Sequence, residues 1–268
     1  MDDRLQSAAR RAESARVFRA FARGGYAASG LVHGLIGALA IVLVVRHGRA
    51  EADQVGALTS IAEAPFGLAA LCAVALLLFA LGVFHVVHGF ALERDSRTRR
   101  WGRRLAEWGQ GVAFCVMGGI ATAVAVGARP DPDRTTRDAS RGLLTLPGGT
   151  VLLILVGIGV AGVGAAWIWM GVSRSFRKQM NIPVGTRGHA IAALGAIGFV
   201  AKGGALLVIA VLLGAAGFQG DSSSAGALDS AITALYDVPG GPACIVCIGL
   251  GFSAYGVFCL FRARLADF

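Results

Sequence analysis

Lys202 is the residue whose type and position point most directly to chemistry, because it lies near the middle of a long apolar run, residues 190–217. A lysine at the centre of a membrane-spanning helix costs about 2.5–3.5 kcal/mol on insertion scales, and such residues often mark a ligand or ion pathway. In the internal repeats described below, Lys202 corresponds to Ser29 and Ala113, and His33 lies one helical turn beyond Ser29. We therefore predict a ligand-binding site at Lys202, Ser29 and His33, with snorkelling of the lysine to an interface as the structural alternative.

Histidines are concentrated in the first two apolar runs. His85 and His88 are three residues apart and share a helix face, and His33 lies in the preceding run. Neutral imidazole is the commonest metal ligand, so His33, His85 and His88 are weak candidates for a haem or transition-metal site. The interiors of the apolar runs contain no carboxylate to complete such a site. No cofactor is therefore predicted, and a haem or metal ion is kept only as a third hypothesis.

Other motifs with catalytic meaning are weak or missing. Cys244 and Cys247 form a Cys-x2-Cys pair, but the pair lies in an apolar run without a second pair, so core cysteines are favoured over a zinc site. The sequence contains no phosphate-binding loop and no nucleophile elbow. We therefore do not expect an enzyme of the hydrolase or kinase type.

Composition defines the environment of these residues. Of the 268 residues, 55% are hydrophobic and 15% are charged, whereas soluble domains carry about 25% charge. Six stretches are long enough to cross the roughly 30 Å core of a bilayer as helices. They are residues 24–45, 66–87, 109–127, 149–172, 190–217 and 240–261. The sequence thus predicts an all-α integral membrane protein with six transmembrane helices.

Lysine and arginine distribution predicts the orientation. Most of the 25 basic residues lie in the N-terminal tail, in the segments after the second and fourth spans, and at the C-terminus. Positive residues stay on the cytoplasmic side, so both termini are expected there. Residues 1–23 are expected to form a basic amphipathic segment on the inner leaflet, where anionic lipids are the expected partners. The net charge of +9 is therefore a sign of topology, and no nucleic-acid partner is expected.

Glycines and prolines repeat three times along the chain. Pro65, Pro147 and Pro239 each precede an even-numbered span and are each followed two residues later by glycine. The other repeated positions are glycines that start the odd spans (Gly25, Gly109 and Gly198) and glycines within the even spans (Gly82, Gly164 and Gly256). The chain is therefore predicted to be three parallel two-helix repeats in a pseudo-threefold arrangement, with these glycines serving close helix packing.

Particular motifs within these repeats resemble a known family. They are Gly-Tyr-x3-Gly at 25–30, Gly-Phe-x3-Gly at 198–203, the Pro-x-Gly entries to the even spans, and the C-terminal run from Ala254 to Arg264. This pattern resembles the bacterial membrane family called domain of unknown function 1206. The resemblance implies three tandem two-helix units, here residues 24–92, 103–176 and 189–264, in a bacterial cytoplasmic membrane. It implies no activity. The middle unit differs in having Phe114 where Gly30 and Gly203 stand in the others.

Three functional hypotheses follow. The first is that the protein binds or passes a small anionic solute at an axial site around Lys202. The second is a non-catalytic membrane subunit that packs against a partner protein or forms a homo-oligomer. The third is a redox subunit that carries haem or metal on His33, His85 and His88.

Overall fold

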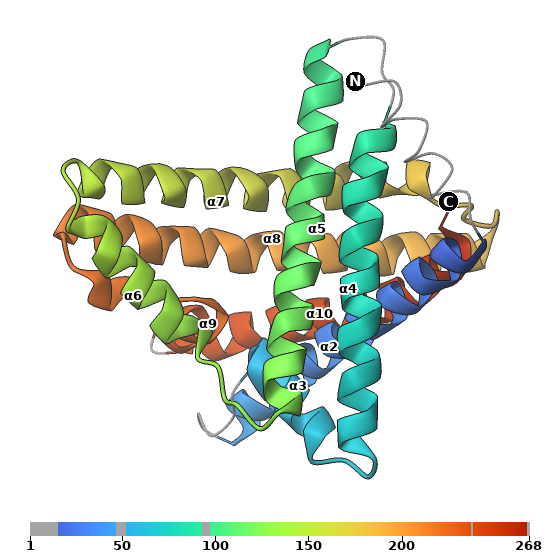
Figure 1. The fold of residues 1–268 in the computed structure, drawn as a ribbon, viewed down its shortest axis with the longest axis horizontal. Helices are drawn as coiled ribbons and strands as arrows, with labels where there is room; N and C mark the ends of the chain where they lie inside the picture. The colour runs from blue at the N-terminus through green and yellow to red at the C-terminus, as the bar shows by residue number, and fades with distance from the viewer. Residues whose placement is uncertain (1–15, 47–51, 93–96, 237, 267–268) are drawn as a thin grey trace. The chain divides into compact units, whose positions relative to one another are not determined.

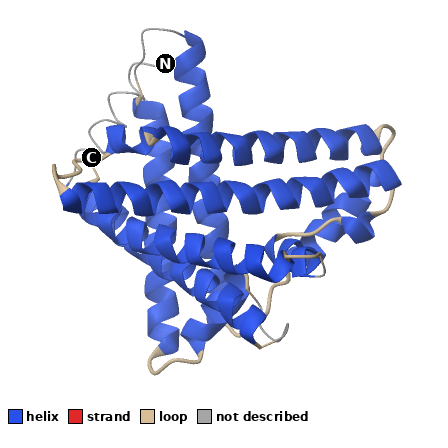
Figure 2. Ribbon diagram, turned by 180° about the vertical axis from the view of Figure 1, so that it is seen from behind, coloured by secondary structure: helices blue, strands red, loops and turns tan. Residues whose placement is uncertain are grey.

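The computed structural model describes residues 16–46, 52–92, 97–236 and 238–266. The chain divides into two compact units. One unit comprises Met1–Leu31, Leu58–Ala128 and Cys259–Phe268, and the other comprises Val32–Ala57 and Arg129–Phe258. Figure 2 shows that helices joined by short loops account for nearly all of the described chain.

Six long helices correspond to the six expected spans (Figure 1). They are α2 (Arg16–Val45), α4 (Gly67–Ala91), α5 (Arg97–Ala125), α7 (Gly149–Ser173), α8 (Thr186–Gln219) and α10 (Gly241–Leu265). All six contain segments long and apolar enough to cross a membrane. The segment in α5 begins at Trp101, eight residues before the expected start at Gly109. We call α2, α5 and α8 the first helices of the three repeats, and α4, α7 and α10 the second helices.

A short helix joins the two long helices of every repeat. These connecting helices are α3 (Gln54–Ala62), α6 (Pro132–Leu144) and α9 (Leu228–Tyr236). Two short 3₁₀ helices, η1 (Ser175–Gln179) and η2 (Ser222–Ser224), complete the elements of the described chain. Asp131 caps α6, with its carboxylate accepting a hydrogen bond from the Arg134 N–H at 2.8 Å. Asp133 is buried and accepts from the N–H groups of Ala227 and Ser230 at the start of α9.

The Pro-x-Gly motif forms the same turn before each second helix. The N–H of Gly67 donates to the Ala64 carbonyl, that of Gly149 to Leu146, and that of Gly241 to Val238. The residue after each proline has a positive φ: 62° at Phe66, 76° at Gly148 and 80° at Gly240. Proline followed by a left-handed residue defines a type II turn. Each second helix then begins at the glycine of the motif.

The second helix of a repeat packs on the first helix of the next repeat. The helices α4 and α5 run side by side, as do α7 and α8 (Figure 1). A Cβ atom at Gly82 would lie 2.9 Å from the Gly111 carbonyl oxygen, and one at Gly164 would lie 2.9 Å from that of Gly203. In α10, a Cβ at Gly249 would lie 2.8 Å from the carbonyl oxygen of Gly37 in α2. Glycine is therefore required where these backbones touch.

These contacts correct the alignment of the middle repeat. Gly111 meets Gly82 and Val86 in the way that Gly203 meets Gly164 and Ile168. Gly111 is thus the structural counterpart of Gly203, and Phe114 lies one turn beyond that position. Gly109 has nothing within 4 Å of its Cβ position, so the packing role expected of it falls to Gly111.

The corrected register changes which residues correspond to the candidate site. The counterpart of Lys202 in the middle repeat is Gln110, one turn before the expected Ala113. The counterpart of Phe199 in that repeat is Glu107. Gly89 contacts the Glu107 Cβ just as Gly171 contacts the Phe199 Cβ, which supports the same shift. A pseudo-threefold arrangement of the three repeats stays a prediction.

The expected N-terminal segment lies only partly within the described residues. Residues 1–15 are outside them, and residues 16–23 form the first turns of α2. The basic residues from Arg16 to Arg23 are therefore continuous with the first span.

Candidate functional site

Two aromatic rings enclose the ammonium group of Lys202. Its Nζ lies 4.1 Å from the centre of the Tyr255 ring and 4.4 Å from the centre of the Trp167 ring. Both distances are within the range of cation–π attraction, which contributes about 0.5–1 kcal/mol at exposed sites and more when the cation is desolvated. Lys202 itself is half-buried. The rings thus offset part of the cost of holding a cation at the midpoint of α8.

Glycines next to Lys202 bring these rings to it. Gly198 lies one turn before the lysine, and a Cβ there would lie 2.6 Å from the Cβ of Tyr255 in α10. Gly203 follows the lysine directly and contacts the backbone of α7 at Gly164, three residues before Trp167. The close approach of α7 and α10 to α8 therefore depends on the repeat glycines that the sequence identified.

His33 lies beside the same tyrosine. The centres of its ring and the Tyr255 ring are 4.9 Å apart with an edge-on arrangement, and the Phe252 ring stacks on His33 at 5.9 Å. His33 is 5% exposed. Two of the three residues predicted to bind a ligand, Lys202 and His33, thus contact one aromatic side chain. Ser29 is also buried in α2, but it belongs to the other compact unit.

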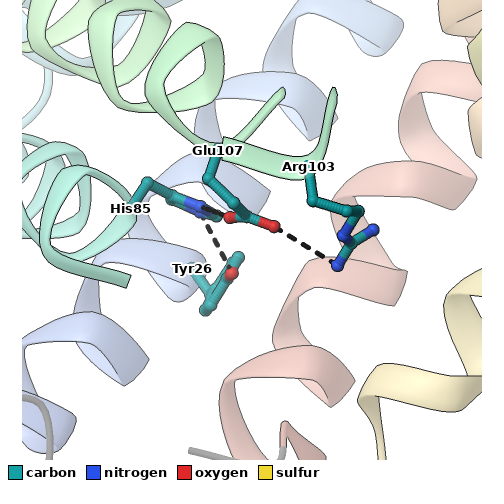
Figure 3. A network of polar contacts seen from close by, with 4 residues as sticks. All are labelled: Tyr26, His85, Arg103 and Glu107. Carbon is teal, nitrogen blue, oxygen red and sulfur yellow. Dashed lines mark hydrogen bonds and ion pairs between the residues drawn. The ribbon is translucent and has the colours of Figure 1, made fainter. Parts of the chain in front are cut away.

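A second polar cluster occupies the unit that contains α4 and α5. Its centre is His85, whose Nδ1 lies 2.8 Å from Oε2 of Glu107 and whose Nε2 lies 3.2 Å from the hydroxyl of Tyr26 (Figure 3). The other carboxylate oxygen of Glu107, Oε1, lies 3.4 Å from Nη2 of Arg103, one turn earlier on α5. Three helices, α2, α4 and α5, therefore contribute to one chain of hydrogen bonds and ion pairs.

Glu107 corrects the expectation that no carboxylate lies with the histidines. Hydropathy predicts that the third span starts at Gly109 and leaves Glu107 outside it, whereas the structure extends this span back to Trp101. The carboxylate is 5% exposed. A usable signal was present in the sequence: Arg103 and Glu107 are four residues apart and form a helical ion pair that lets a carboxylate enter a span.

The histidines predicted as metal ligands each contact other side chains of the protein. His85 uses both ring nitrogens on Glu107 and Tyr26, whereas His88 stacks on Phe84 with ring centres 5.8 Å apart. His33 belongs to the other unit. Among the residues that the structure describes, no group of three histidine, cysteine or acidic side chains is arranged to hold a metal ion.

Several buried donors at the start of α5 lack a hydrogen-bond partner. They are Nε of Arg103, Nε of Arg104 and Nε1 of Trp108. Arg104 is 6% exposed, and its Nη2 donates to the carbonyl of Phe90 at 3.3 Å. Buried donors without a partner are costly, so a group that accepts hydrogen bonds would stabilise this end of the helix pair.

Both clusters are built on the same repeat position. His85 follows Gly82 by three residues, and Trp167 follows Gly164 by three. His85 faces Glu107 and Trp167 faces Lys202, in each case across the contact with the first helix of the next repeat. The third counterpart, Cys259, is 1% exposed. The repeat thus presents a different side chain at one position of each helix pair.

These features define a multi-pass helical membrane protein with internal repeats. The family described as Domain of Unknown Function (DUF1206) matches residues 24–91, 108–174 and 197–266 of the chain, one match for each repeat. The chain belongs to this family, which confirms the resemblance seen in the sequence. No curated protein and no solved structure matches it.

Proposed function

We propose that this protein binds a small anionic solute within the membrane, at a site formed by Lys202, Tyr255, Trp167 and His33. The observation that carries the proposal is the placement of the Lys202 ammonium between two aromatic rings, one of which also contacts His33. Such a cluster holds a positive charge at a fixed place among apolar helices. Passage of the solute across the membrane would use the same site.

The depth of Lys202 supports a functional role over snorkelling. Helix α8 runs from Thr186 to Gln219, and Lys202 lies at its midpoint. At about 1.5 Å per residue, either end of the helix is roughly 25 Å away, and the edge of a 30 Å hydrocarbon core is about 15 Å away. A lysine side chain is about 6 Å long and does not reach that edge. The charge therefore remains in the apolar region, where an anionic partner interacts with it most strongly.

The aromatic rings favour recognition because they attract the ammonium without neutralising it. A ring face interacts with a cation through its quadrupole and carries no net charge. The two rings therefore restrict the position of the Lys202 ammonium without adding a negative charge beside it. A carboxylate or phosphate group is the solute chemistry that this arrangement favours.

The proposed setting is a bacterial cytoplasmic membrane with both chain termini on the inner side. The asymmetry of lysine and arginine in the sequence supports this orientation. Anionic lipids are the proposed partners of the basic helix ends, and the unpartnered donors of Arg103, Arg104 and Trp108 support a headgroup contact there.

Native mass spectrometry of the protein, gently extracted from its own membrane, tests the solute proposal. The wild-type chain is expected to retain a small molecule that the Lys202→Met variant loses. The matched control is Lys178→Met, because Lys178 is the other lysine of the chain and is exposed. A retained small molecule that is unaffected by Lys202→Met would contradict the proposal.

The same spectra separate the alternative functions. A stoichiometric protein partner with no small molecule would indicate a non-catalytic subunit of a larger complex. A retained mass equal to haem, together with a Soret band, would indicate a redox subunit that uses His33, His85 or His88.

A further inference from the structure

We propose that the Tyr26–His85–Glu107 chain is a proton-binding relay, a site separate from the solute site at Lys202. Tyr26 comes from α2, His85 from α4 and Glu107 from α5, and the hydrogen bonds between them measure 3.2 Å and 2.8 Å (Figure 3). The proposal does not depend on the proposed function, because it concerns the other compact unit.

Burial distinguishes this chain from an ordinary surface ion pair. Tyr26 is 3% exposed, His85 2% and Glu107 5%. The phenyl ring of Phe114 stacks on the His85 ring with centres 5.3 Å apart, and the Phe84 ring meets its edge at 5.7 Å. The side chain of Arg103, at the far end of the network, is 36% exposed. The hydrogen-bond network therefore connects the buried Tyr26 hydroxyl to Arg103, which reaches the surface of the protein.

Each hydrogen bond has a defined donor when Glu107 is ionised. The Nδ1–H of His85 then donates to the carboxylate, and Nε2 accepts from the Tyr26 hydroxyl. Histidine is the side chain that ordinarily changes charge near neutral pH, and chains of histidine and acidic residues inside membranes serve as proton relays. The geometry of this cluster is therefore suited to accepting a proton at His85.

Proton uptake proceeds by transfers that conserve every atom. A proton that arrives at the Tyr26 oxygen releases the hydroxyl proton of that residue to Nε2 of His85, so one O–H bond breaks as one N–H bond forms. The Nδ1 proton can then pass to Oε2 of Glu107, which leaves a neutral imidazole and a neutral carboxylic acid. Release of that proton at the Arg103 end leaves Glu107 ionised and His85 as the Nε2–H tautomer. Rotation of the imidazole ring must then exchange its two nitrogens before another proton can pass.

Some charged groups around His85 stabilise its protonated form and others destabilise it. Glu107 stabilises a positive His85, whereas Arg262 and His88 have the opposite effect. The guanidinium of Arg262 in α10 lies 4.6 Å from the centre of the Tyr26 ring, and Cys259 is the remaining titratable group near that tyrosine. The Arg262 cation against the Tyr26 ring disfavours a positive charge on the adjacent imidazole. Such a balance favours transfer over permanent protonation.

The test measures proton uptake by the full-length protein in lipid nanodiscs after a pH jump. The wild-type chain is expected to take up one more proton than the His85→Asn variant, and Glu107→Gln is expected to lose the same proton. Tyr26→Phe keeps the His85–Glu107 hydrogen bond but removes the entry group, so it is expected to slow uptake at least tenfold without changing its extent. His189→Asn is the control for an exposed histidine outside the network.

A second measurement does not depend on any variant folding. In ¹⁵N-histidine spectra of the wild-type protein, His85 is expected to be the Nδ1–H tautomer at high pH and to become protonated as the pH falls. Infrared difference spectra are expected to show a protonated carboxyl band from Glu107. A His85 ring that keeps one protonation state over the whole range in which the protein stays folded would overturn the proposal, as would an uptake rate unchanged by Tyr26→Phe.

Discussion

His85 and Trp167 occupy the same position in two consecutive repeats, and each faces a charged residue on the first helix of the next repeat. His85 is hydrogen-bonded to Glu107, and the Trp167 ring lies 4.4 Å from the Lys202 ammonium. Glycine contacts at Gly82–Gly111 and Gly164–Gly203 bring both pairs together. The same glycine contact between two helices thus supports two sites with different chemistry. Duplication of a sequence followed by substitution of side chains readily produces such a pair of sites.

The glycine contact between α7 and α8 gives the first prediction. Gly203→Ala is expected to destabilise the protein by about 1–3 kcal/mol, because its Cβ would lie 2.5 Å from the Gly164 carbonyl oxygen and the two backbones would have to separate. Gly204→Ala is the control, since nothing lies within 4 Å of its Cβ position. Thermal unfolding in detergent measures both. Equal midpoints for the two variants would contradict the packing described.

The register of the middle repeat gives the second prediction. Gly111→Ala is expected to destabilise the protein and Gly109→Ala to leave its stability unchanged or slightly raised. The physical reason is that Gly111 touches Gly82 and Val86, whereas the Cβ position of Gly109 is open. If Gly109→Ala unfolded at a lower temperature than Gly111→Ala, Gly109 and not Gly111 would be the residue at the helix contact, and the register described here would be wrong.

Much of the fold follows from the sequence, but the alignment of the middle repeat with the other two does not follow from hydrophobicity. The six spans, the three repeats and the Pro-x-Gly turns all have composition or spacing signals. Glycine is so frequent, at 39 of 268 residues, that Gly109 and Gly111 both offer plausible alignments. The spacing to the following proline distinguishes them, since Gly111 to Pro147 and Gly203 to Pro239 are both 36 residues.

The candidate sites were predictable to different degrees. Lys202 can be identified from the sequence alone, because it is a charged residue within an apolar run. Tyr255 and Trp167 are not distinguishable from ordinary core aromatics until α7 and α10 are placed against α8. Hydropathy does not identify Glu107, because it places the charged turn that carries this residue outside the third span. Contacts with His85 of α4 and with Arg103 of α5 hold that turn inside the span.

The turn before α4 gives the third prediction. Phe66 has a φ of 62° and is exposed, so its side chain strains the backbone without contributing to the core. Phe66→Gly is expected to stabilise the protein by up to about 1 kcal/mol, because left-handed backbone costs a residue with a side chain roughly 1–2 kcal/mol. Leu68→Gly, in the first turn of α4, is the control and is expected to destabilise. Denaturant unfolding that ranks Phe66→Gly below the wild type would contradict the strain argument.

The acidic caps of the connecting helices give the fourth prediction. Asp133 is 6% exposed and accepts hydrogen bonds from two N–H groups of the α9 segment, at 2.6 Å and 3.1 Å. Asp133→Ala is therefore expected to cost about 1–3 kcal/mol by leaving those donors unpaired. Asp138→Ala removes only exposed ion pairs with Arg134 and Arg141, at 3.8 Å each, and is expected to change stability by less than about 0.5 kcal/mol. Comparable losses in the two variants would refute the capping role.

Asp221 gives a pH-dependent prediction. The hydroxyl and the N–H of Ser223 both donate to its carboxylate, which holds the pKa of Asp221 below its ordinary value of 3.8. Since the folded-state pKa is lowered, the contribution of this group to stability is complete above that ordinary value. The contribution is lost as the pH falls through the lowered pKa. Ser223→Ala is expected to raise the pKa of Asp221 toward 3.8 in a carboxyl NMR titration, whereas Ser224→Ala, whose hydroxyl donates to Gln219, is not.

The measurement that most directly tests the central claim uses the fact that Lys178 and Lys202 are the two lysines of the chain. In a protein labelled on lysine with ¹³C and ¹⁵N, the side-chain signal of Lys202 is expected to be shifted upfield by the rings of Trp167 and Tyr255, and that of Lys178 to lie at its ordinary position. Titration with acetate and inorganic phosphate as probes is expected to move the Lys202 signal saturably and to leave Lys178 in place. Identical positions for the two signals, or a Lys202 signal that neither probe moves, would contradict an anion site at Lys202.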